Sequence, residues 1–114
     1  MPCLGLGHSM TNFRRMAKRL RIDLGDFNSF MDAALNQRKP SPYRVLFEAY
    51  DKSLAAIELQ ELRQAAWIRA NLDEPDFEVG YKEHGERLKV LERESLARLE
   101  RIFRAYRKAR ASGE

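Results

Sequence analysis

The residue types that most often hold metals are few in this chain of 114 residues. Cys3 is the single cysteine, and His8 and His84 are the two histidines. A structural zinc site needs a full set of such ligands at short, regular spacing. Metal sites in helical bundles use Glu-x-x-His motifs, and the sequence has none. We therefore predict no metal site and no other cofactor.

Nucleophilic catalysis has an equally weak basis. Cys3 and His8 are close in sequence, but residues 1–8 contain two glycines and predict a flexible lead-in without a rigid frame. The Gly-x-Gly sequence at residues 5–7 follows no strand, so it does not predict a phosphate-binding loop. We predict that the protein is not an enzyme and has no catalytic residue.

Lysine and arginine give the strongest pattern. Residues 14–19 contain four cations and no acid, and residues 98–110 contain six cations and one acid, Glu100. At about 100° per residue, both sets fall opposite an apolar stripe. Guanidinium groups match phosphate oxygens two at a time, so both rows are expected to contact a nucleic-acid backbone. The expected contacts are Arg14, Arg15, Lys18, Arg19, Arg98, Arg101, Arg104, Arg107, Lys108 and Arg110.

The charge along the chain supports the same interpretation. The net charge is +5 over residues 1–44, −5 over residues 45–78 and +4 over residues 79–114. No residue pattern is suited to reading bases, so binding should depend on salt and little on nucleotide sequence. The predicted function is a non-catalytic accessory protein that binds nucleic-acid backbone, as a small subunit of a nucleoprotein complex.

Two other interpretations of the basic rows stay open. They could be solvated faces, with the C-terminal row complementing the helix dipole. The first helix could also dock on an acidic flank of the long helix, formed by Glu48, Asp51, Glu58 and Glu61. A membrane-surface helix is disfavoured, because the first half of the last helix contains many acids.

A protein–protein interaction module is the competing function, in the form of an adaptor, an inhibitor or an antitoxin-like partner. The long helices have more apolar residues than two short helices can cover, so an apolar surface should remain. Leu62 and Trp67 are the expected partner contacts. A homo-oligomer or a hetero-complex is therefore expected.

A helix-turn-helix DNA-binding regulator is a further alternative, with residues 28–37 as the recognition helix. This segment offers Asn28, Asn36 and Gln37 to the bases, but it also contains Asp32 and no cation. Base-reading helices usually present Arg, Lys, Asn or Gln to the groove. The set is therefore only partial.

The composition predicts a single all-α domain. Ala, Leu, Arg and Glu are common, whereas the β-branched Val, Ile and Thr are scarce. After the lead-in, two short helices are expected within residues 9–40, and long helices over residues 41–72 and 83–111. The long segments are similar in length and have a short connection, so they should form an antiparallel αα-hairpin. The two short helices should pack on one end of it.

Local signals set the expected boundaries. Ser41 can act as an N-cap with Pro42 at the first helical position, and Asp26 can cap the second helix. Residues near Gly80 and Gly85 are ambiguous, because glycine weakens a helix.

The expected location is the cytoplasm. One cysteine cannot form an internal disulfide, which favours a reducing compartment. The N-terminal residues lack the charged and apolar regions of a signal peptide. No stretch approaches the ~20 apolar residues of a membrane span, so no membrane partner is expected.

Overall fold

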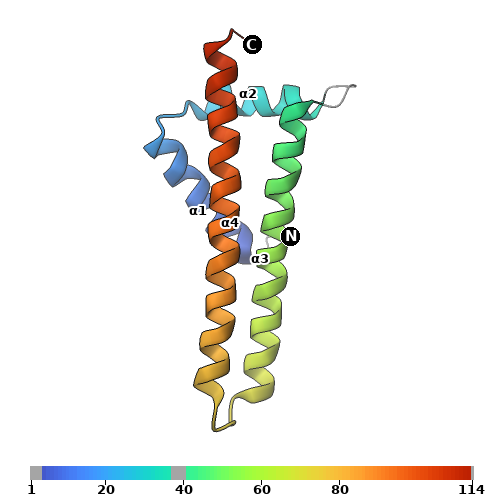
Figure 1. Ribbon diagram of the computed structural model, residues 1–114, viewed down its shortest axis with the longest axis vertical. Coiled ribbons are helices and arrows are strands. Elements are labelled where there is room, and N and C mark those ends of the chain that lie inside the picture. Colours follow the sequence, from blue (N-terminus) through green and yellow to red (C-terminus); the bar gives the residue numbers. More distant parts are fainter. Residues whose placement is uncertain (1–3, 37–40, 114) are drawn as a thin grey trace.

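The computed structural model of the protein describes residues 4–36 and 41–113, with side chains from Thr11 onward. This part of the chain forms four helices and no strand: α1 (Leu4–Arg19), α2 (Leu24–Leu35), α3 (Pro42–Asn71) and α4 (Phe77–Ala111). Helices α3 and α4 run antiparallel as a long hairpin, and α1 and α2 pack on the half that holds the start of α3 (Figure 1). The predicted all-α fold with a long hairpin is confirmed.

The hairpin begins where the capping signals predict. The Ser41 hydroxyl accepts a hydrogen bond of 3.2 Å from the backbone N–H of Tyr43, and Pro42 is the first helical residue. Because proline has no N–H to lose and a fixed φ, it is well suited to that position. Helix α3 then runs without a break for 30 residues to Asn71.

Helix α4 begins at Phe77 rather than near residue 83, and Trp67 gives the reason. The indole of Trp67 lies against α4 at Gly80, where a Cβ atom would overlap the ring. The same ring stacks on Phe77, with centroids 5.3 Å apart. Glycine at position 80 therefore permits close packing of the two helices, although it lowers the intrinsic helix preference of the segment.

The two short helices begin earlier than expected. Helix α1 starts at Leu4. The prediction of a flexible lead-in over residues 1–8 is therefore wrong for residues 4–8, and residues 1–3 lie outside the described residues. The helix continues through two glycines, each of which costs up to about 1 kcal/mol relative to alanine. Helix α2 is capped by Asp23 rather than Asp26: Oδ1 of Asp23 accepts bonds from the N–H groups of Gly25 (3.0 Å) and Asp26 (3.2 Å).

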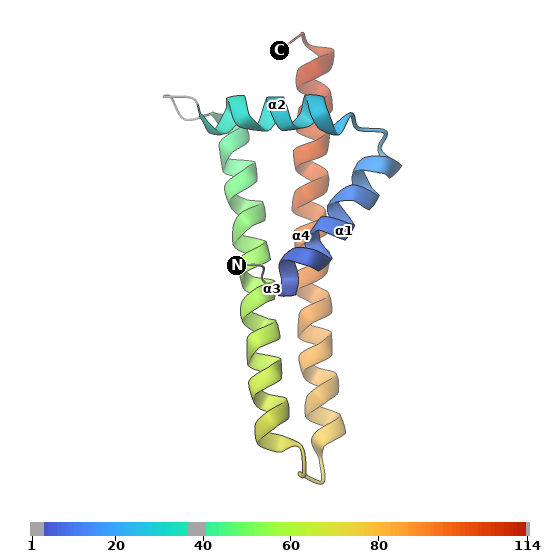
Figure 2. The same ribbon diagram turned by 180° about the vertical axis from the view of Figure 1, so that it is seen from behind.

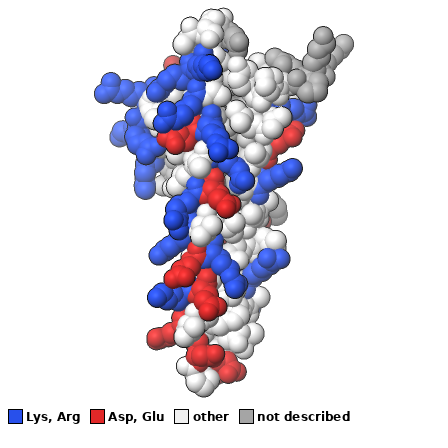
Figure 3. All heavy atoms as spheres, viewed as in Figure 1, with Lys and Arg blue, Asp and Glu red and all other residues white. Residues whose placement is uncertain are grey.

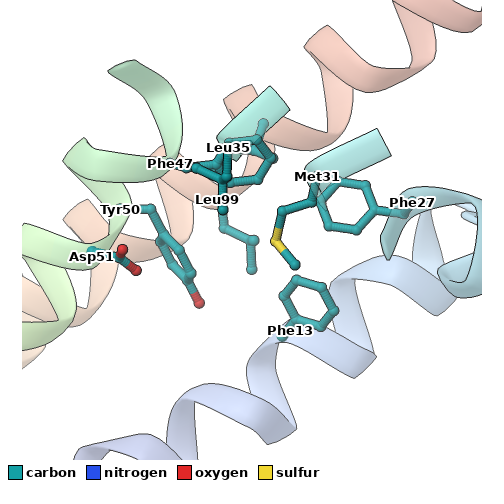
Figure 4. Close-up of a pocket in the computed structure, with 9 residues that line it drawn as sticks. Phe13, Phe27, Met31, Leu35, Phe47, Tyr50, Asp51 and Leu99 are labelled. Carbon is teal, nitrogen blue, oxygen red and sulfur yellow. The ribbon is translucent and has the colours of Figure 1, made fainter. Parts of the chain in front are cut away.

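The core lies where α1 and α2 meet the hairpin (Figures 1 and 2). Phe27 of α2 is fully buried there, with its ring centroid 4.9 Å from that of Phe103 and 5.3 Å from that of Tyr106. All four helices line a small apolar cavity of about 140 Å³ beside this ring (Figure 4). Its lining residues are Phe13, Phe27, Met31, Leu35, Phe47, Tyr50, Asp51, Leu99 and Ile102.

The other half of the hairpin consists of α3 and α4 alone (Figures 1 and 2). Its seam contains a polar pair in which Nε2 of buried Gln60 lies 2.9 Å from Nδ1 of His84. None of the described helices has an apolar stretch long enough to cross a membrane.

Candidate nucleic-acid interface

The C-terminal half of α4 separates apolar and basic side chains as predicted. Leu99, Ile102 and Tyr106 are buried against the other helices. The residues at intervening positions point outward, because a helix turns about 100° per residue. The exposed cations are Arg101, Arg104, Arg107, Lys108 and Arg110, whereas Arg98 is half-buried.

Helix α1 repeats this arrangement on a smaller scale. Met16 and Ala17 are buried in the core. The four cations of the helix, Arg14, Arg15, Lys18 and Arg19, are all exposed. Viewed with α4 in front, the Lys and Arg side chains gather over the half of the molecule that contains α1 and the end of α4 (Figure 3). The opposite half of the same face has acidic and basic side chains intermixed.

The two basic rows meet at Glu100. Its Oε1 atom lies 3.1 Å from Nη2 of Arg104 on α4 and 3.7 Å from Nη2 of Arg19 on α1. Both guanidinium groups are largely exposed. The cations of α1 and α4 therefore belong to one continuous surface, although they are far apart in sequence.

A shallow groove of about 200 Å³ runs beside this contact, between α1 and α4. Met16 and Leu96 supply its apolar part. Asn12, Arg15 and Arg19 supply amide and guanidinium groups. Residues 12, 15 and 19 lie on one face of α1, because they are three and four positions apart. We call Asn12, Arg15, Arg19, Glu100 and Arg104 together the α1–α4 junction.

Arg110 has a different environment from the rest of its row. Its Nε donates to Oδ2 of Asp26 at 2.8 Å, and its Nη2 donates to Oδ1 at 3.1 Å. The Tyr106 hydroxyl donates to the same Oδ2 at 2.5 Å. These hydrogen bonds hold the pKa of Asp26 below its usual value. The bond from Tyr106 has the largest effect and that from Arg110 the next largest. Arg110 therefore joins α4 to α2, in addition to any role in binding.

Of the remaining predicted contacts, Arg98 lies 4.0 Å from Glu94 one turn earlier on α4. Arg101 and Lys108 lie on the outer side of α4, and Arg14 and Lys18 on the outer side of α1, by helical spacing. The structure thus brings Arg15 and Arg19 to one groove and places Arg104 beside Arg19 at Glu100. The outer cations flank that group.

Sequence reasoning did not identify Glu100, Asp26 or Asn12 as parts of this region. The spacing of Glu100 and Arg104 by four residues does indicate their ion pair within the helix. The approach of Arg19 to Glu100 and of Arg110 to Asp26 has no local signal, because each depends on how the helices pack.

The alternative sites can also be placed. Leu62 is exposed on α3, at 58 % of its possible surface. Trp67 is half-buried in the hairpin seam, against Phe77 and with its ring centroid 5.3 Å from that of His84. The ion pair of Arg19 runs to Glu100 of α4 rather than to the acidic flank of α3.

The proposed recognition helix of the helix-turn-helix alternative corresponds to α2. Phe27, Phe30 and Ala34 of this helix are buried, and Asn28 and Asp32 are exposed. There is no Lys or Arg from residue 24 to residue 36. Gln37, the last residue of the predicted recognition helix, lies outside the described residues.

Within residues 4–36 and 41–113, no three His, Cys, Asp or Glu side chains are grouped so that they could hold a metal ion. Comparisons of the chain with protein-family models, with curated proteins and with solved structures found no match.

Proposed function

We propose that this protein is a non-catalytic helical accessory protein that binds nucleic-acid backbone, as a small subunit of a nucleoprotein complex. The observation that supports this most directly is the junction at Glu100, where the basic rows of α1 and α4 form one surface. A surface that combines both rows can contact several phosphates at once, and backbone affinity grows with the number of phosphates neutralised. The single cysteine favours a reducing compartment, so the proposed location is the cytoplasm.

The spacing of the α4 row fits a phosphate chain. Arg101, Arg104 and Lys108 extend along roughly 10 Å of helix, at about 1.5 Å per residue. One strand of a duplex places a phosphate about every 3.4 Å along its axis, so this length faces about three phosphates. The helix is rigid, so the cations hold their spacing without an ordering cost in the backbone.

Binding of this kind should not depend on nucleotide sequence. The exposed side of α2 has no cation between residues 24 and 36, and the cations of α1 and α4 lie on helix surfaces that suit phosphate contact. Phosphate contacts position a protein on nucleic acid, whereas base edges supply specificity. The helix-turn-helix alternative therefore has less support than backbone binding.

The experiment is a salt titration of binding to a fluorescent duplex of random sequence, followed by anisotropy. Each neutralised phosphate should contribute about 0.9 to the slope of log affinity against log salt. Four or five contacts would weaken binding about 150-fold to 500-fold between roughly 50 and 200 mM salt. Replacing Arg101, Arg104 and Lys108 with glutamine should remove about three phosphate contacts and lower the magnitude of the slope by about 2.7.

The matched control removes the same number of charges from the other half of α4, with Lys82, Lys89 and Arg93 replaced by glutamine. These three side chains are also exposed, and all three precede Leu96, the α4 residue that lines the groove with α1. The control should lower the slope much less. If wild type does not bind duplex or single strands at low salt, the proposal is wrong for the isolated protein. If both triple variants lost the same amount of duplex affinity and of salt slope, net charge alone would set the affinity.

A protein–protein interaction module is the second candidate, because one face of α3 is apolar and exposed. Leu59 and Leu62 are 48 % and 58 % exposed, and Ala55 and Ala66 continue their row at helical spacing. This row lies opposite the buried side of α3 that contains Ile57. A partner helix could cover it, and such a partner could be a second copy of this chain or another protein.

A further inference from the structure

Glu100 occupies an unusual position for an acid on a basic surface. It is the only Asp or Glu between residues 98 and 110. Its Oε1 atom contacts guanidinium groups from two different helices, at 3.1 Å for Arg104 and 3.7 Å for Arg19. Its side chain is less exposed than either arginine, at 36 % against 71 % and 64 %. The carboxylate therefore lies within ion-pair distance of both guanidinium groups, while part of its side chain stays in contact with solvent.

A phosphate group has the same requirements as this carboxylate. Both present anionic oxygens that accept charge-assisted bonds from guanidinium forks. The groove next to Glu100 adds the Arg15 guanidinium and the Asn12 amide. Once the carboxylate moves away, a phosphate at the α1–α4 junction could thus contact Arg19 and Arg104, with Arg15 in the adjoining groove.

The carboxylate can be displaced at low cost. Ion pairs between exposed side chains contribute only about 0–1 kcal/mol. Glu100 is on the surface of a helix, so rotation of its side chain places the carboxylate in water without moving the backbone. A phosphate held by a polymer that is already bound to Arg101 and Lys108 competes well, because its effective concentration is high.

We infer that the α1–α4 junction is a binding site for one backbone phosphate of a nucleic acid, and that Glu100 is an internal competitor for this site. The inference rests on the proposed function and identifies the part of the surface where the phosphate binds. In the free protein the Glu100 carboxylate pairs with both Arg19 and Arg104 and offsets one of their two positive charges. In the complex the phosphate takes its place, and Glu100 turns to solvent.

The test compares Glu100→Gln with Glu94→Gln in the same anisotropy titration. Glu94 is exposed, lies on α4 and pairs with Arg98 of the same basic row at 4.0 Å, so its replacement changes the net charge equally and frees a cation that lies outside the junction. We expect Glu100→Gln to raise duplex affinity about threefold to tenfold, because up to two surface ion pairs no longer compete. The salt slope should increase by about one contact, or roughly 0.9. Glu94→Gln should change both quantities by a much smaller amount.

Three further arms make the outcome specific. In a background with Arg19 and Arg104 replaced by glutamine, Glu100→Gln should have little effect, because the groups it competes for are gone. Inorganic phosphate at millimolar concentration should compete poorly, because it lacks the flanking contacts. Strong competition would assign the site to free phosphate instead of the polymer and overturn this part of the inference. Thermal melts by circular dichroism confirm that each variant is folded.

The failure of this inference differs from failure of the proposed function. If wild type binds with a steep salt slope while Glu100→Gln and Glu94→Gln behave alike, the junction site is refuted and backbone binding stands. If neither wild type nor Glu100→Gln binds at low salt, both proposals are wrong.

Discussion

The hydroxyl of Tyr106 on α4 donates a hydrogen bond of 2.5 Å to Oδ2 of Asp26 on α2. The same carboxylate accepts two bonds from Arg110, one turn further along α4. The Arg110 guanidinium also lies over the rings of Phe30 (5.5 Å) and Tyr106 (5.6 Å), where cation–π attraction adds to the ion pair. This cluster fixes α2 across the end of the hairpin, where α2 packs over the buried core.

Replacing Asp26 with asparagine should lower the melting temperature at about pH 7. The substitution removes the ion pair to Arg110 and leaves Tyr106 with a weaker acceptor. The control is Asp32→Asn, which removes an exposed acid from the same helix without disturbing the bonds to Tyr106 and Arg110. Equal melting temperatures for the two variants would contradict a stabilising role for the cluster.

The same cluster predicts how stability depends on pH. The hydrogen bonds from Tyr106 and Arg110 lower the pKa of Asp26 from its ordinary value of 3.8. A group whose pKa is depressed by folding stabilises the protein above its unfolded pKa, and this contribution is lost as pH falls through the folded pKa. Melts between about pH 5 and pH 2 should therefore show a steeper loss of stability for wild type than for Asp26→Asn. Parallel curves would refute the assignment.

A pair of glycines in α4 should respond in opposite directions to substitution with alanine. At Gly80 a Cβ atom would overlap the Trp67 ring, so Gly80→Ala should destabilise the hairpin by about 1–3 kcal/mol. At Gly85 an added Cβ atom would have no described neighbour within 4 Å, so Gly85→Ala should stabilise the helix by up to about 1 kcal/mol. Urea denaturation followed by circular dichroism measures both changes. Combining Gly80→Ala with Trp67→Leu should restore part of the loss, and full additivity would argue against the contact.

The hairpin could be predicted from sequence because its signals are local. Ser41 and Pro42 mark the start of α3 through the chemistry of one cap, and the repeat of Leu99, Ile102 and Tyr106 identifies the buried side of α4. The early start of α4 could not be predicted in the same way. Gly80 lowers helix preference locally, and only the packing of Trp67 explains why glycine is required there.

The basic rows, too, were visible in sequence as two separate features. The two rows meet at Glu100 because of the angle and register at which α1 packs on α4. Neither the angle nor the register can be predicted from a short stretch of sequence. Asp26 shows a related limit. A carboxylate before an apolar run predicts an N-cap, but Asp23 has that role and Asp26 instead accepts bonds from residues about 80 positions away.

Phe27→Ala should be among the most destabilising single substitutions. The ring is fully buried and packs against Phe103 and Tyr106. Truncation of a buried phenylalanine typically costs about 3–5 kcal/mol, and the cavity that already lies beside this ring would grow (Figure 4). Met31→Leu, which conserves volume at the same cavity, should cost less than about 1.5 kcal/mol. Similar losses for the two variants in denaturant titrations would mean that Phe27 is not central to the core.

The apolar row on α3 gives a prediction about association. Ala55, Leu59, Leu62 and Ala66 are exposed on one side of the helix at spacings of four, three and four residues. This pattern is the same read in either direction, so an antiparallel copy would set Leu59 against Leu62 and Ala55 against Ala66. Interfaces with two-fold symmetry require such self-complementary contacts. We expect the protein to self-associate through this row.

Replacing Leu59 and Leu62 with lysine should therefore convert the protein to a monomer in sedimentation velocity experiments at increasing concentration. The melting temperature of the monomer should change little, because exposed positions usually contribute within about 0.5 kcal/mol. Val79→Lys with Val90→Lys is the matched control, since these residues of α4 are similarly exposed at 61 % and 47 %. The control should still associate. A wild type that sediments as a monomer at every concentration would refute self-association through α3. Duplex binding should survive in the Leu59 and Leu62 variant, because the substitutions lie outside the junction of α1 with α4. Its avidity should be lower than that of the Val79 and Val90 variant, which adds the same two positive charges but keeps the second basic surface that dimerisation supplies.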